Sequence, residues 1–160
     1  MIARTVPSAS TGAHRGARLT LRAGLAIMAT VQALVGVVAL FFPRSFYARV
    51  PGVDLLPPYN EHLMTDVGEL NLAIAFGLMI AVVTLDRLLV RTVLAGYLLY
   101  AVPHLVFHLS HLSGFGAGTA VVQTAGLVIL MLLPLGLLIL THGRKRGTPD
   151  PGQAGRSGLH

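Results

Sequence analysis

The chain of 160 residues contains no cysteine and no tryptophan, and only 11% of its residues are charged. The absence of cysteine excludes disulfides, thiolate metal sites, iron–sulfur clusters and cysteine nucleophiles. Soluble domains are usually about 25% charged, so this depletion argues against a water-soluble fold. With 54% hydrophobic residues and a mean hydropathy of +0.72, the composition is typical of an integral membrane protein.

Acidic residues are also scarce: there are six, against 12 Lys and Arg residues, and the formal net charge is +6. A chain with a pI near 10.8 can bind nucleic acid, but here the basic residues gather in the tails and beside apolar runs. That distribution is typical of topology signals and contacts with anionic lipid. We therefore expect the lipid bilayer as a partner, and no nucleic acid.

Four apolar runs predict four transmembrane helices, at about residues 22–42, 61–85, 88–112 and 119–140. The first run is too long for a cleaved signal peptide and is followed by Pro43, so we expect it to be retained. Residues 1–20 and 142–160 are predicted to be disordered tails around a membrane domain of residues 21–141. The predicted fold class is an all-α integral membrane four-helix bundle with up-down-up-down topology.

The connections between these helices carry clear signals. Four prolines in Pro43–Pro58 predict a loop, and Ser113–Gly118 predicts a short glycine-rich hairpin. Asn60 and Asp86 are the expected N-caps of the second and third helices. Isolated polar residues in the first and fourth helices should hydrogen-bond between helices, and they are Gln32 and Gln123.

The basic residues predict the orientation of the bundle. Four spans place both termini on one side of the membrane, together with the turn near residue 87. That side carries ten of the 12 Lys and Arg residues, and the other side carries Arg44 and Arg49. The positive-inside rule therefore predicts that both termini are cytoplasmic.

Two polar stripes interrupt the apolar pattern, and each has three ionisable side chains on one helical face. The first lies near the start of the second predicted helix and consists of His62, Asp66 and Glu69. The second lies near the end of the third predicted helix and consists of His104, His108 and His111, extended by Tyr97 and Tyr100. Because a tight turn joins these helices, the stripes should lie at similar depth, and we predict one outer-leaflet site from all six ionisable residues.

Three interpretations of this six-residue site stay open at the level of sequence. The carboxylates and imidazoles can simply pair with each other, because charges in the membrane interior are costly. They can bind a Zn, Fe, Mn or Cu ion, since His104 and His108 present two imidazoles on one face. They can also form a proton or quinone site, with Tyr97 and Tyr100 continuing the histidines inward. Di-iron bundles carry a Glu-x-x-His motif, in which a histidine stands three residues after a glutamate. That motif is missing here, because the residue three positions after Glu69 is Leu72.

The segments FFPRSFYARVPG, YNEHLMTDVGELNLA and AVPHLVFHLSHLSG resemble those of small, largely uncharacterised four-helix membrane proteins of high-GC Gram-positive bacteria. These proteins are loosely similar to DoxX-like proteins, and the resemblance covers about residues 22–141. It implies the bacterial plasma membrane, and DoxX-like relatives imply quinone-linked redox chemistry as an analogy without a residue-by-residue motif.

The functional hypothesis is therefore a small redox-associated or metal-binding membrane protein. The alternatives are a proton- or solute-pathway subunit, or an accessory protein whose polar cluster is only structural. For protein partners, we expect that the bundle forms a homo-oligomer or belongs to a larger membrane complex. The sequence does not identify a reaction.

Overall fold

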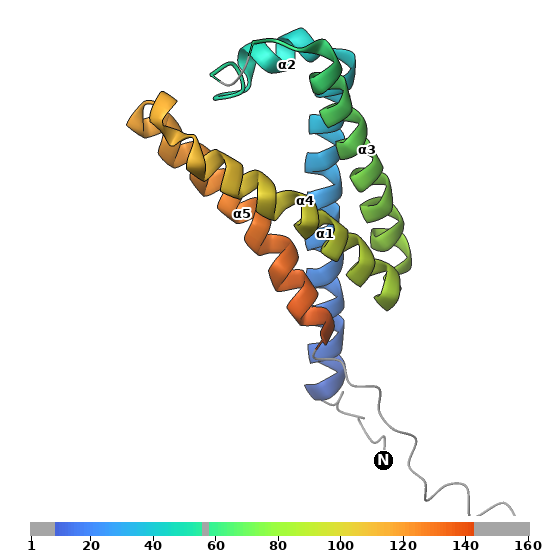
Figure 1. The fold of residues 1–160 in the computed structure, drawn as a ribbon. Helices are drawn as coiled ribbons and strands as arrows, with labels where there is room; N and C mark the ends of the chain where they lie inside the picture. Colours follow the sequence, from blue (N-terminus) through green and yellow to red (C-terminus); the bar gives the residue numbers. More distant parts are fainter. Residues whose placement is uncertain (1–8, 56–57, 143–160) are drawn as a thin grey trace, which may run out of the picture.

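The computed structural model describes residues 9–55 and 58–142, which form helices joined by short connections (Figure 1). Four long helices follow one another as α1 (Ala9–Phe41), α3 (Glu61–Thr84), α4 (Arg87–Ser110) and α5 (Ala117–His142). Two short elements connect them, α2 (Pro43–Arg49) and the 3-10 helix η1 (Leu112–Gly114). Each long helix is apolar and long enough to cross a membrane, so the predicted all-α fold with four helices of membrane-spanning length is confirmed.

Local capping explains where α3 and α4 begin. Asn60 Oδ1 accepts a hydrogen bond from the backbone N of Leu63 at 3.2 Å, and Asp86 Oδ1 accepts one from Leu89 N at 2.8 Å. Both predicted N-caps are therefore confirmed. Between the two helices, Leu85 ends α3 in the left-handed conformation (φ 49°), a cost that its side-chain packing against the core offsets.

Two predicted boundaries are wrong. Residues 9–20 were expected to belong to a disordered tail, but they form the first turns of α1. Extending an existing helix avoids the cost of nucleation, and the Ala and Arg residues of this segment favour helix. The predicted loop Pro43–Pro58 contains α2, because proline fits the first turn of a helix, where its missing N–H is not needed. Of the predicted tails, residues 1–8 and 143–160 lie outside the described residues.

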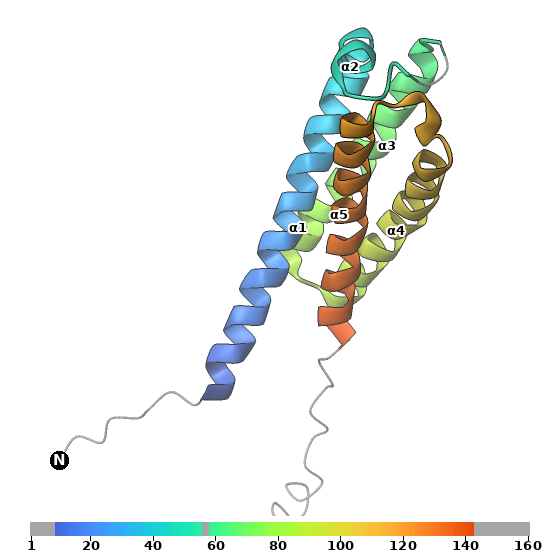
Figure 2. The same ribbon diagram turned by 90° about the vertical axis from the view of Figure 1, so that its left-hand side faces the viewer.

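The long helices pack as two pairs. α1 packs mainly with α3, and α4 packs mainly with α5, whereas α3 and α4 make little contact despite the tight turn between them. Figure 1 shows the α4–α5 pair leaning away from the α1–α3 pair toward the end of the molecule that holds α2. Figure 2 shows that α1 starts and α5 finishes toward the same opposite end.

Glycines bring the backbones of α1 and α3 together. A Cβ atom on Gly68 would lie 2.5 Å from the backbone N of Leu40, and one on Gly36 would lie 2.7 Å from Cγ of Leu72. These two contacts also show that the helices run in opposite directions. Close approach of this kind increases van der Waals contact, which holds membrane helices together because lipid supplies no hydrophobic drive between them.

The end of the molecule near the α3–α4 turn is held by arginines and an apolar core. Arg87 Nη2 donates to the backbone O of Thr141 at 2.7 Å, and Arg91 Nε donates to Thr141 Oγ1 at 3.2 Å. Arg91 Nη2 also donates to the backbone O of Thr141 at 3.2 Å, so both arginines bind a terminal carbonyl of α5 and complement its negative dipole end. The adjoining apolar cluster draws on all four long helices, with members that include Leu25, Leu78, Leu94 and Leu137.

The glycine contact predicts a stability difference. Gly68→Ala places a methyl group against the backbone of α1, so we expect a loss of about 1–3 kcal/mol and a lower melting temperature in detergent. Gly96→Ala is the matched control, because a Cβ there would meet no described atom within 4 Å. Alanine favours helix by about 1 kcal/mol, so the control should melt at or above the wild-type temperature. Equal melting of both variants would contradict the close packing.

Candidate functional site

Four ring side chains follow one another along α4 and form what we call the α4 column. The ring centroids are 6.2 Å apart for Tyr97 and Tyr100, 5.3 Å for Tyr100 and His104, and 4.6 Å for His104 and His108. Spacings of three and four residues bring successive side chains onto one helical face. Tyr97 and His108 are buried, whereas Tyr100 and His104 are half-buried. The column therefore runs along the edge of the packed interior.

A glutamine from α5 binds the end of the column. Gln123 Nε2 lies 2.8 Å from His108 Nδ1, and the His108 side chain is buried, with 8% of its residue surface exposed. With the amide nitrogen as donor, Nδ1 is the acceptor and the ring proton lies on Nε2. The Gln123 Oε1 atom is buried and has no hydrogen-bond partner within the described ranges. The predicted inter-helix role of Gln123 is confirmed.

The loop after α2 packs against the Gln123 side chain. Gly52 adopts φ +86°, and a Cβ there would lie 3.2 Å from either amide atom of Gln123 and 2.5 Å from Cε1 of Phe115. Only glycine fits both the positive φ and this close approach. The loop therefore packs closely against the Gln123 side chain.

Buried amides from α3 and α1 complete the polar interior. Asn71 is 2% exposed, its Nδ2 donates to the backbone O of Val67 at 2.7 Å, and its side chain interacts with Tyr100. Asn71 and Tyr100 lie equally far from the α3–α4 turn and hence at the same depth. Gln32 on α1 is 4% exposed, and its Nε2 finds no hydrogen-bond partner among the described residues. α1 and α3 thus each supply one buried amide, and α5 supplies the half-buried Gln123.

The structure separates the six residues of the predicted site. His62 Nδ1 and Asp66 Oδ1 lie 3.3 Å apart, but their side chains are 85% and 52% exposed, and Glu69 is exposed beside them. His111 is also exposed and stacks on Phe107 at 4.2 Å. Only His104 and His108 of the six remain together in the α4 column.

The rotation of α3 explains this separation. Its buried face carries Gly68 and Asn71, because Gly68 must face α1 for the two backbones to meet. The stripe of His62, Asp66 and Glu69 lies on other faces of the helix and is turned outward. In residues 9–55 and 58–142, no group of three or more His, Asp or Glu side chains could hold a metal ion. The groups that could bind a metal ion are therefore the adjacent imidazoles of His104 and His108.

No family model, curated protein or solved structure matches this chain. The resemblance to DoxX-like proteins stays a prediction.

Asn71 belongs to the polar interior although it lies off the predicted stripe. In the structure, the Tyr100 side chain of α4 interacts with that of Asn71. A sequence signal for it existed: Asn71 and Tyr100 are equally far from the midpoint of the Leu85–Asp86 turn. A single amide in an apolar run needs a partner, and the hairpin depth indicates which one.

The bond between His108 and Gln123 predicts a coupled effect on stability. Gln123→Leu leaves buried His108 Nδ1 without its partner, so we expect a loss of about 1–3 kcal/mol. His108→Leu should cost a similar amount, because it leaves the buried Gln123 amide unpaired. The double variant should cost clearly less than the sum of the two, measured as thermal unfolding in detergent. Strict additivity would show that the bond contributes nothing.

Proposed function

We propose that this chain is a multi-pass membrane protein that exchanges protons between one aqueous face and the membrane interior through the α4 column. The observation that carries the proposal is the unbroken contact series of four titratable rings from Tyr97 to His108. Imidazole and phenol groups both donate and accept hydrogen bonds. Ionisable residues inside membrane spans often mark proton paths.

The extent of the column favours exchange with the membrane interior over transport across it. Tyr97 lies near the middle of α4 and His108 lies in its last turn. At about 1.5 Å per residue the column spans roughly 16 Å, which is about half of the hydrocarbon thickness. Toward Arg87 the same face continues with Leu94 and Val90, which are apolar and buried. A proton that enters at His108 thus ends near the bilayer midplane.

The Gln123 amide suits a histidine that changes protonation state. Its Nε2 donates to the neutral imidazole, as the observed distance of 2.8 Å to His108 Nδ1 allows. After a flip of the amide, its Oε1 can accept a hydrogen bond from the protonated ring. One residue can therefore pair with His108 in both states, which an aliphatic side chain could not do.

A column that delivers protons to the bilayer midplane suits a lipid-soluble quinone as the reactant. Reduction of a quinone to a hydroquinone adds two electrons and two protons to its two carbonyl oxygens. The electrons come from a redox partner, and the column supplies the protons. Tyr100 and His104 are stacked with an interplanar angle of 23° and are half-buried, so a flat headgroup can reach them from the lipid.

A metal ion is the second candidate, favoured by the 4.6 Å separation of the His104 and His108 rings. Two imidazoles at i and i+4 are a common start for a Zn, Cu, Fe or Mn site. The remaining ligands would have to come from a second copy or another subunit, which links this candidate to a homo-oligomer or a larger membrane complex.

The orientation that we propose is up-down-up-down, in a bacterial plasma membrane, with both termini in the cytoplasm. It is supported by the ten of 12 Lys and Arg residues on the side of the tails and the α3–α4 turn. The His108 end of the column then faces the outside. A reporter enzyme fused after His160 should be active in the cytoplasm, and activity outside the cell would contradict the orientation.

Quinone retention tests the proposed function. Organic extracts of the detergent-purified protein should contain a quinone, measured by chromatography with absorbance detection. Tyr100→Phe and His104→Ala each remove a polar group that can bind the headgroup, so we expect the retained quinone to fall by about tenfold. His62→Ala is the control, because that exposed side chain lies on α3 outside the column.

Metal analysis of the same preparations separates the two candidates. If wild type lacks quinone but holds stoichiometric metal that His104→Ala removes, the metal site replaces the quinone proposal. If His62→Ala loses as much quinone as the column variants, the binding site has been placed on the wrong helix.

A further inference from the structure

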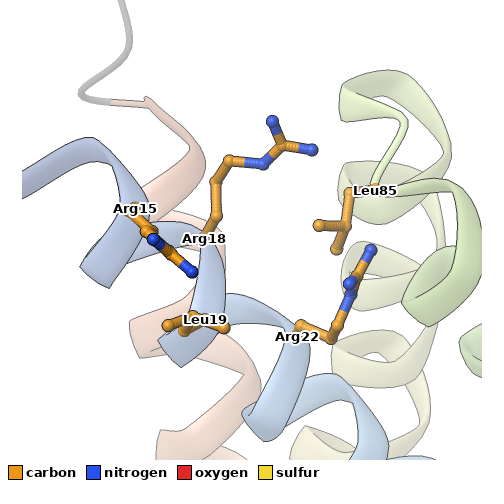
Figure 3. Close-up of a pocket in the computed structure, with 5 residues that line it drawn as sticks. All are labelled: Arg15, Arg18, Leu19, Arg22 and Leu85. Carbon is orange, nitrogen blue, oxygen red and sulfur yellow. The ribbon is translucent and has the colours of Figure 1, made fainter. Parts of the chain in front are cut away.

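A basic pocket lies at the end of the molecule opposite the Gln123 end of the column. It has a volume of about 340 Å³ and is lined by Arg15, Arg18, Leu19, Arg22 and Leu85 (Figure 3). The three arginines follow i, i+3 and i+7 on α1, so one face of this helix presents them together. Leu85, at the left-handed end of α3, forms the facing wall.

The pocket is built between two helices and is more than a charged tail. Arg22 Nε donates to the backbone O of Val82 at 3.2 Å, which ties α1 to the end of α3. A guanidinium has five N–H donors, so Arg22 keeps others for a ligand. Arg15 and Arg18 are exposed on the same side of α1. The lining is therefore three positive charges with two leucines.

This lining matches the phosphate of an anionic lipid. The planar fork of arginine matches the oxygens of a phosphate group, and several arginines can share one or two such groups. Leu19 is 59% exposed within the same pocket, which suits the apolar part of an amphiphile better than a free anion. The long apolar run of α1 begins directly after Arg22, which places the pocket at headgroup depth.

We infer that the pocket between α1 and the end of α3 is a binding site for the phosphate headgroup of an anionic phospholipid. The site lies in the leaflet on the side of the chain termini. This lipid site requires the four membrane spans but not the α4 column. It is therefore independent of the proposed proton exchange. Arg15 and Arg18 bind the phosphate, Arg22 keeps α1 and α3 together, and Leu19 contacts the acyl region.

The test is lipid titration of the full chain in detergent, with bound lipid counted by native mass spectrometry. Dioleoyl phosphatidylglycerol should bind wild type more tightly than dioleoyl phosphatidylcholine does. R15Q/R18Q should weaken phosphatidylglycerol binding by about tenfold and leave phosphatidylcholine binding unchanged. R144Q/R146Q removes the same charge from the C-terminal basic run and should stay within about twofold of wild type.

The controls distinguish a specific lipid site from general attraction to positive charge and from binding of a free anion. Equal weakening in R144Q/R146Q would show general attraction to positive charge and overturn the site, and so would wild-type binding by R15Q/R18Q. Displacement of the lipid by excess inorganic phosphate would show that a free anion is the ligand and overturn the lipid assignment. R15K/R18K keeps the charge without the fork and should bind at an intermediate level, which tests the pocket even if R15Q/R18Q does not fold.

Discussion

The backbone contact between α1 and α3 at Gly36 and Gly68 determines which face of α3 points inward. The two backbones can approach only where neither helix carries a Cβ in the way. Once Gly68 faces α1, the periodicity of α3 places Asn71 in the interior and His62 on the surface. The polar site therefore depends on a contact that contains no polar side chain.

The composition of the interior follows from the membrane environment. Lipid supplies no hydrogen-bond partners, so buried polar side chains must pair within the protein or remain costly. His108 pairs with Gln123, and Asn71 pairs with its own helix and with Tyr100. Together these residues connect α3, α4 and α5 through polar groups that water reaches poorly. In such surroundings the protonation of one ring affects the next, because electrostatic interactions are strong at low dielectric.

Much of the fold could be predicted from the sequence, because the physics that decides it is local. Hydrophobic runs of sufficient length predict the four spans, and Asn60 and Asp86 predict where α3 and α4 begin. The site could be predicted only in part. The spacing of Tyr97, Tyr100, His104 and His108 identified the column, since neighbours on one helix are fixed by periodicity.

The pairing of stripes between α3 and α4 could not be predicted in the same way. Hairpin depth says which residues are level, but it does not say how each helix is rotated about its axis. Here the rotation of α3 is decided by its contact with α1, and α4 packs with α5. His62, Asp66 and Glu69 were therefore expected at the right height but lie on the wrong face.

The central claim is that the α4 column exchanges protons with the aqueous phase at its His108 end. Nitrogen NMR of protein labelled with ¹⁵N-histidine in bilayers tests it most directly, because ring nitrogens report protonation. The account predicts that the signals of His104 and His108 change together as the bulk pH is varied between about 5 and 8. Signals of both residues that stay unchanged over this range would contradict it.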